Sequence, residues 1–273
     1  MIPRSPISLA ALRRLLLEID SSGRREHVLA IGGARELAPL LRQQFLRDGA
    51  DPASVRLGEP EHADVYVHVF AREPGAGDEA VLRRARRAHV PVIAVVVDPA
   101  GDESIPYVLA TDVVPVAEGQ GFRLETIARA IAARLGEHGA PLAGHVPLLR
   151  PAVSQQLVES FARKNGLVGA AIFIPGADLP VLALNEMRLV LRLAQAYGEE
   201  SGSVRLPELV ATLGAGFGLR ALARELLGLV TIAGWAVKGA VAYGGTRALG
   251  EAARRRYELG TTPRPDATAP AGP

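Results

Sequence analysis

The front half of the chain alternates short apolar runs with segments whose apolar residues have helical spacing. The runs expected to form strands are residues 27–31, 54–58, 63–70, 90–97 and 112–116. The segments expected to form helices are residues 34–48, 77–89 and 122–135. The run at 90–97 is nearly all apolar and β-branched, which is typical of a central parallel strand covered on both faces. This alternation predicts an α/β domain at residues 24–137, built on a parallel, doubly wound sheet.

The residues before this domain predict one amphipathic helix over Ser8–Ile19, with Ser8 as its N-cap. Its apolar positions are Leu9, Leu12, Leu15, Leu16 and Ile19. We expect residues 1–23 to form a separate N-terminal element that packs against the α/β domain. Contact with a membrane surface is the alternative for this helix.

The back half, residues 148–258, is hydrophobic, rich in small residues and predicted to be all-α. A first helix is expected at Pro151–Asn165, ended by Gly166. A second is expected to run to about Tyr197 and to stop at Gly198, because glycine is the usual residue just after a helix. A third apolar segment covers residues 206–227.

The second of these helices carries one narrow polar stripe on an otherwise apolar surface. Its members, at i, i+3 and i+4 spacing, are Asn185, Arg188, Arg192, Gln195 and Glu199. Most of the circumference of this helix must therefore be buried in protein or lipid.

Leu226–Gly245 has the length and composition of a membrane-spanning helix, with Lys238 as its single charge. A spanning helix needs about 20 mostly apolar residues. Small residues recur at every fourth position, at Ala236, Ala240, Gly244, Ala248 and Ala252. Such a strip lets another helix approach closely. The pattern predicts a transmembrane helix, and a soluble helical bundle is the alternative.

Two stretches lack any periodicity. Residues 138–147 are rich in Gly, Pro and His and are expected to form an interdomain linker. Residues 259–273 are rich in Pro and Ala and are expected to form a disordered tail.

Composition excludes several kinds of chemistry. The chain has no cysteine, which excludes disulfides, cysteine-ligated metals and thiol nucleophiles. The net charge of +2, without any long block of like charges, argues against a nucleic-acid partner. His62 and His68 are six residues apart beside a predicted strand, but solvated or hydrogen-bonded histidines are expected there rather than a metal site.

The order of elements in the front domain resembles that of a small GTPase, whereas its motifs do not. A P-loop requires a lysine that neutralises the β- and γ-phosphates, and this chain has no lysine before Lys164. Arg35, in the turn after the first strand, is not an equivalent substitute. At the guanine-reading motif, Asp98 and Pro99 stand where Asn and Lys are needed. We therefore expect a degenerate, pseudo-GTPase-like domain without GTP hydrolysis.

Any ligand of a doubly wound sheet is expected at the carboxyl ends of its strands. In this chain these ends are Gly32, Gly33, Ala71 and Asp98. Gly32 and Gly33 form a fragment of a dinucleotide-binding motif whose third glycine is missing. A tight turn that requires glycine is the expected role of this pair. Gly32, Gly33 and Asp98 stay the candidate binding residues, and no cofactor is predicted.

The back half resembles the YcjF-like bacterial domain of unknown function. The resemblance rests on the stretches I-P-G-A-D-L-P-V-L-A-L-N-E-M at 174–187, A-Y-G at 196–198, L-G-A-G-F-G-L-R-A-L-A-R-E-L-L at 213–227 and A-V-A-Y-G-G-T-R-A-L-G at 240–250. Members of that family are often described as inner-membrane proteins, and some carry a GTPase domain ahead of the hydrophobic one. The resemblance implies membrane association and no known reaction.

These patterns together predict a non-enzymatic, membrane-associated protein. Its pseudo-GTPase-like head would face the cytoplasm and recruit an unknown protein partner at the bacterial inner membrane, with self-association also possible. The enzyme alternative binds a nucleotide or small ligand at Gly32, Gly33 and Asp98. The third hypothesis is a soluble helical interaction module that docks on a partner or on itself.

Overall fold

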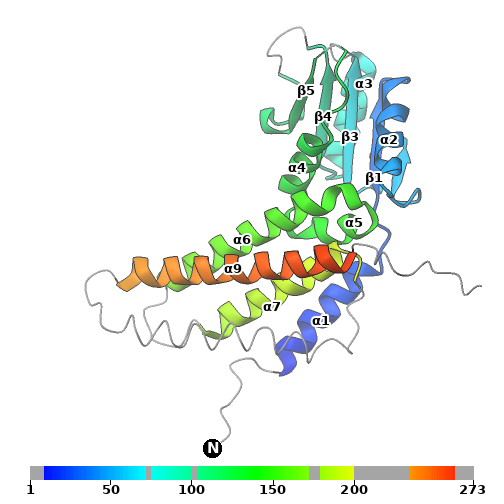
Figure 1. The fold of residues 1–273 in the computed structure, drawn as a ribbon. Coiled ribbons are helices and arrows are strands. Elements are labelled where there is room, and N and C mark those ends of the chain that lie inside the picture. Colours follow the sequence, from blue (N-terminus) through cyan, green and yellow to red (C-terminus); the bar gives the residue numbers. More distant parts are fainter. Residues whose placement is uncertain are drawn as a thin grey trace, which may run out of the picture.

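The computed structural model of the chain describes residues 9–71, 75–99, 104–117, 119–171, 179–199 and 234–261. A head with a five-stranded parallel sheet stands on one end of a helical arm (Figure 1). The predicted order of an α/β part followed by a helical part is confirmed. The expected helix at residues 206–227 and most of the expected tail lie outside the described residues.

The sheet has the strand order β2-β1-β3-β4-β5, and all neighbouring pairs are parallel. The strands are β1 (Leu29–Gly33), β2 (Val55–Leu57), β3 (Val65–Ala71), β4 (Val92–Val97) and β5 (Val113–Val116). Each lies within or next to a run that the sequence predicts as a strand. This order is the flavodoxin-like arrangement of doubly wound sheets, in which the winding reverses between β1 and β3.

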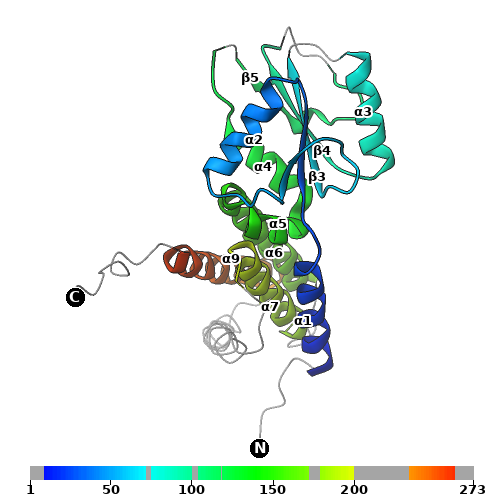
Figure 2. The same cartoon turned by 90° about the vertical axis from the view of Figure 1, so that its right-hand side faces the viewer.

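Helices cover both faces of the sheet (Figure 2). Helices α2 (Leu37–Arg47) and α4 (Leu124–Leu135) pack on one face, and α3 (Ala76–Arg87) packs on the other. Because successive side chains of a strand point to opposite faces, β3 contributes to both cores. Val65, Val67 and Val69 face α2 and α4, whereas Tyr66 and Phe70 face α3.

The predicted linker is a helical corner buried between head and arm. It contains the 3-10 helix η2 (Gly136–His138), helix α5 (Gly139–His145) and the 3-10 helix η3 (Pro147–Leu149). The segment predicted as an interdomain linker is therefore helical. Residues 139–143 are all buried, so this turn of α5 has no polar face and shows no amphipathic period in the sequence.

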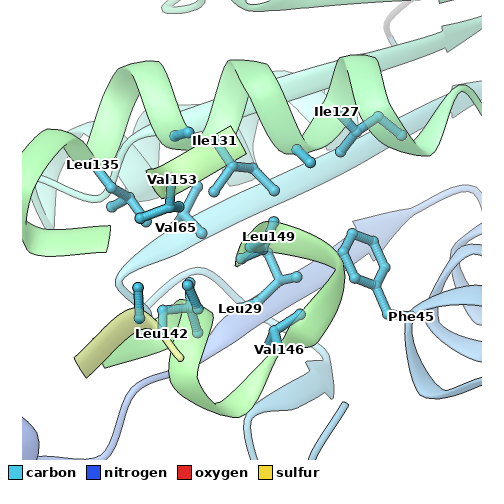
Figure 3. Close-up of a cluster of buried hydrophobic side chains, with 14 of the residues drawn as sticks. Leu29, Phe45, Val65, Ile127, Ile131, Leu135, Leu142, Val146, Leu149 and Val153 are labelled. Atoms are coloured by element: carbon cyan, nitrogen blue, oxygen red, sulfur yellow. The ribbon is translucent and has the colours of Figure 1, made fainter. Parts of the chain in front are cut away.

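This corner joins the cores of head and arm into one. Leu142, Val146 and Leu149 lie against Leu29 and Phe45 of the head (Figure 3). The same cluster of buried side chains continues into the arm through Val153, Leu157 and Phe161. Arg150 closes the corner, because its guanidinium donates to the carbonyls of Ala143 and Gly144. Head and arm thus share a continuous hydrophobic core.

The arm consists of α6 (Arg150–Ala171), α7 (Leu179–Ala196) and α9 (Gly234–Thr261), with α1 (Leu9–Gly23) on its outer side (Figure 1). Helix α6 continues through Gly166, so the prediction that this glycine ends the helix is wrong. Its role is close packing against the antiparallel α9. A Cβ on Gly169 would lie 2.8 Å from the Cβ of Ala242, and a Cβ on Gly239 would lie 3.0 Å from the carbonyl oxygen of Gly166.

The polar stripe of α7 is covered by α1. Arg192 is only 3% exposed and donates to Glu18, Ser22 and Gln195. Arg188 forms an ion pair with the same Glu18 carboxylate. Helix α1 therefore packs on the helical arm. The expectation that this helix packs against the α/β domain is wrong. The predicted burial of most of α7 is confirmed, and Arg192 is buried beside partners that α1 supplies.

Helix α7 ends as the sequence predicts. Gly198 has a φ of +76°, and its N–H bonds to the carbonyl of Gln195 while the N–H of Glu199 bonds to that of Ala194. This is the paired hydrogen-bond pattern of a Schellman motif, which requires a left-handed residue.

A second buried polar cluster links the three long helices. The side-chain amide of Asn165 on α6 donates to Thr246 on α9, and that of Asn185 on α7 donates to Asn165. Thr246 in turn donates to Glu186, which is 2% exposed. These directional contacts fix the register of the helices in the arm.

The prediction of a transmembrane helix is corrected. No helix among the described residues is long and apolar enough to cross a bilayer. The described part of the predicted segment, residues 234–245, lies in α9, and that helix continues with charged residues from Arg247 onward. The described part of the segment is thus one end of a mixed helix.

His27 joins α1 to the head. Its Nδ1 lies 3.2 Å from the Asp64 carboxylate and its Nε2 lies 2.6 Å from the carbonyl oxygen of Ser22. Both partners are acceptors, so both ring nitrogens donate only when the imidazole is protonated. The hydrogen bond to Asp64 is the largest cause that raises the pKa of His27 above its usual value.

Candidate functional site

The carboxyl ends of the strands point away from the arm. Leu29, at the start of β1, lies at the junction (Figure 3), so Gly32 and Gly33 lie at the far end of the head. Asp98 directly follows β4, and β3 runs between β1 and β4. The structure therefore brings the three candidate residues to the same edge of the sheet, on either side of β3.

Both glycines at this edge are required by packing. A Cβ on Gly32 would lie 2.1 Å from the hydroxyl oxygen of Tyr66. Gly33 has a φ of +101°, and a Cβ there would lie 2.1 Å from the carbonyl oxygen of Val69. These contacts explain the pair as a tight turn at which β1 passes close to β3. The side chain of Tyr66 occupies the space beside Gly32.

Asp98 has a left-handed backbone with a φ of +53°. Its N–H donates to the carbonyl oxygen of Val116, which closes the carboxyl ends of β4 and β5. The backbone of Asp98 therefore joins the ends of β4 and β5, whether or not its side chain binds a ligand.

A buried network of three side chains lies under the same edge, on the face that α3 covers. The Tyr66 hydroxyl lies 3.0 Å from Nδ1 of His68, and Nε2 of His68 lies 2.7 Å from the Asp78 carboxylate. Asp78 also accepts the N–H of Gly75 and so caps the start of α3. Since Asp78 accepts from Nε2, the other ring nitrogen is free to accept the tyrosine proton.

Burial favours the neutral forms of the His68 imidazole and the Tyr66 hydroxyl. Burial lowers the pKa of His68, although its hydrogen bond to Asp78 opposes that shift. Burial also raises the pKa of Tyr66. The order of acid, imidazole and hydroxyl resembles a catalytic relay, but Tyr66 is 2% exposed and packs against Gly32. The arrangement orients α3 over the sheet and presents no hydroxyl to a substrate.

The spacing of His62 and His68 in the sequence did not reveal this network. His62 is exposed with a left-handed backbone, whereas His68 is buried, so the two have different roles. No group of three metal-ligating side chains occurs among the described residues. The alternation Tyr66, His68, Phe70 along one face of β3 was the available signal, but Asp78 comes from another element.

A shallow groove, here called the head groove, lies at this end of the head on the face of α2 and α4. Its volume is about 230 Å³. It is lined by Leu37, Leu40, Gln43, Gln44, Arg47, Val97, Val116, Gln120, Gly121 and Phe122. The combination of aliphatic side chains with three glutamines suits an apolar side chain of a partner with its neighbouring peptide groups. The volume is below the roughly 300–1,000 Å³ usual for small-molecule sites.

A second groove, here called the arm groove, lies between α6 and α9. Its volume is about 570 Å³. It is lined by Arg163, Gly166, Leu167, Ala170, Ala236, Gly239, Ala240 and Tyr243. Leu167 in this lining is 71% exposed.

Comparison of the chain with protein-family models, curated proteins and solved structures finds no match. The resemblance to the YcjF-like family therefore stays a prediction from its motifs, of which 174–178 and 213–227 lie outside the described residues.

Proposed function

We propose that this protein is a non-enzymatic adaptor whose head recruits one protein partner and whose arm binds another. The observation that carries the proposal is the continuous core through α5 and η3. A shared core holds two binding surfaces at a fixed separation, whereas a flexible linker would leave them independent. The sequence-based expectation of a partner-recruiting protein is kept in this form.

The two grooves lie at opposite ends of this rigid body. The head groove is at the carboxyl edge of the sheet, away from the junction. The arm groove involves the end of α6 and the start of α9, which lie farthest from the head (Figure 1). Two apolar surfaces so placed suit an adaptor better than an enzyme, which gathers its groups in one concave site.

The proposal that the head binds no nucleotide has two supports. The hydroxyl of Tyr66 lies where a ligand would approach Gly32, and no lysine precedes Lys164. The flavodoxin-like strand order gives no support to a GTPase-like ancestry of the head, so the adaptor function is proposed without it. The proposal includes no membrane-spanning anchor.

Affinity purification of three charge-introducing variants tests the adaptor function. Leu40→Glu lies in the head groove, Leu167→Glu lies at the arm groove, and Leu109→Glu is a control of similar exposure outside both. We expect the two groove variants to lose different partners and the control to keep both. Retention of every partner by both groove variants, or specific micromolar binding of GTP or ATP in calorimetry, would contradict the proposal.

A further inference from the structure

Helix α1 lies along α7 of the arm, and the chain then passes directly into β1 of the head (Figure 2). A small cluster of buried side chains joins the two helices, made of Leu15, Ile19, Met187 and Leu191. These buried side chains form a cluster separate from the core that head and arm share. A helix with a small core of its own can open locally while the main core stays folded.

The ion pairs between α1 and α7 depend on a single carboxylate. Glu18 pairs with both Arg188 and Arg192, and its side chain is 47% exposed. The Nε atoms of the two arginines are buried and have no hydrogen-bond partner among the described residues. Ion pairs made by a half-exposed carboxylate contribute little to stability. This seam alone therefore holds α1 weakly.

The end of α1 is tied to the head through His27, which is buried. Nε2 of the ring lies 2.6 Å from the carbonyl oxygen of Ser22 in α1. Nδ1 lies 3.2 Å from the carboxylate of Asp64, in the segment before β3. Since both partners are acceptors, this bridge between helix and head is complete only when both ring nitrogens carry a proton.

Loss of one ring proton breaks the bridge on the side of α1. The neutral ring keeps one N–H, and a hydrogen bond to a carboxylate is stronger than one to a carbonyl. The proton therefore stays on Nδ1 and faces Asp64, which the N–H of Val28 also holds in place. The lone pair of Nε2 then faces the carbonyl oxygen of Ser22 at 2.6 Å. Two acceptors at this distance repel each other, so the end of α1 is pushed away.

The groups around the ring set the direction of the pH dependence. The hydrogen bond to Asp64 is the largest cause that raises the pKa of His27, and the Ser22 carbonyl raises it as well. Burial and the neighbouring Arg25 lower this pKa. The net shift is upward, so the ring is charged below pH 6.5 and loses its proton as the pH rises through the higher folded value.

We infer that α1 is a strap that closes over α7 while His27 is protonated and opens as the ring loses its proton. Opening uncovers Met187 and Leu191 together with the guanidinium groups of Arg188 and Arg192. The strap thus controls access to an apolar and basic face of the arm. This inference concerns neither of the two grooves and is independent of the adaptor function.

Hydrogen exchange of the full chain, read by mass spectrometry, tests the strap at pH values below 6.5 and in steps above it. Peptides from α1 report its opening and peptides from β4 report the core, after correction for the intrinsic pH dependence of exchange. We expect the protection of α1 to fall about tenfold or more, because a hydrogen bond from a charged donor is lost, while β4 keeps its protection. The midpoint should coincide with the titration of the His27 ring followed by NMR.

Three variants show whether the ring is responsible. Asp64→Asn removes the carboxylate that raises the pKa of His27 and should move the opening to lower pH. His27→Gln cannot carry the charge, so the protection of its α1 should not change with pH. His62→Asn is the matched control, since His62 is an exposed histidine of the head with a left-handed backbone that asparagine tolerates. It should open like the wild type.

Protection of α1 that stays constant while the His27 ring titrates would overturn the inference. It would also be overturned if α1 and β4 lose protection together, because His27 would then act on the whole fold, or if His27→Gln keeps the pH dependence of the wild type. Should a variant fail to fold, the comparison of α1 with β4 in the wild-type protein still decides. Partner capture by the two grooves is tested separately by the purification experiment.

Discussion

Leu149 is the side chain at which the continuity of head and arm can be tested most directly. It is fully buried in η3 and lies against residues of the head, with Val146 beside it (Figure 3). Leu149→Ala removes three carbons from a site enclosed by several elements, which cannot all move in to fill the space. Leucine-to-alanine changes in such sites cost about 2–5 kcal/mol, and we expect about 3 kcal/mol here.

Hydrogen exchange read by mass spectrometry measures where this loss appears. If head and arm unfold as one unit, peptides from β4 in the head and from α6 in the arm lose the same protection. A loss of about 3 kcal/mol corresponds to exchange that is roughly a hundredfold faster in both. The exposed change Leu109→Ala is the control and should shift protection by no more than about 0.5 kcal/mol.

Unequal effects would refute the shared core. If Leu149→Ala accelerates exchange in α6 while β4 keeps its wild-type protection, the head folds independently of the corner. The rigid separation of the two grooves, and with it the main support for an adaptor, would then be lost.

Three further predictions concern local contacts. The raised pKa of His27 means that its stabilising contribution is complete below pH 6.5 and is lost as pH rises through the higher folded value. The melting temperatures of wild type and His27→Gln should therefore differ most below pH 6.5 and converge as the pH rises above it. Gly32→Ala should lower the free energy of unfolding, measured in urea, by about 1–3 kcal/mol, because the added Cβ would lie 2.1 Å from the Tyr66 hydroxyl. The loss should be smaller in a Tyr66→Phe background, and an equal loss in both backgrounds would disprove the contact. Gly169→Ala should also destabilise the protein, because the added Cβ would lie 2.8 Å from the facing helix. Gly244→Ala has open space around it and should stabilise the protein by about 0.5–1 kcal/mol. A stabilising effect of Gly169→Ala would contradict the close packing of α6 and α9.

The sequence predicted elements well wherever a local signal marks them. The β-branched run that became β4 and the glycine stop at Gly198 are local signals, and both are confirmed. The helix within residues 138–147 has no such signal. Its residues 139–143 are all buried, so no polar face marks it, and its glycines and proline are also typical of a loop.

The sequence also could not show which residues pack against the glycines, either in the arm or at the candidate site. Gly166 was interpreted as a helix end, yet it lies inside α6 where a second helix comes close. Gly32 and Gly33 were correctly expected to form a turn, but the sequence could not name Tyr66 as the side chain against them. Such contacts depend on which strands are neighbours, and that order is set by the whole fold.

The pairing of α1 with α7 has a consequence for the order in which the chain can fold during synthesis. Glu18 and Arg188 are separated by 170 residues. At typical rates of 5–20 residues per second, the ribosome needs roughly 10–30 s to deliver α7 after α1. In the later part of that interval, once β5 has been synthesised, the entire sheet can form while Leu15 and Ile19 still lack their partners on α7. A nascent chain stopped before α7 should therefore hold a folded head behind a protease-sensitive first helix, an apolar segment that chaperones can reach until the arm closes over it.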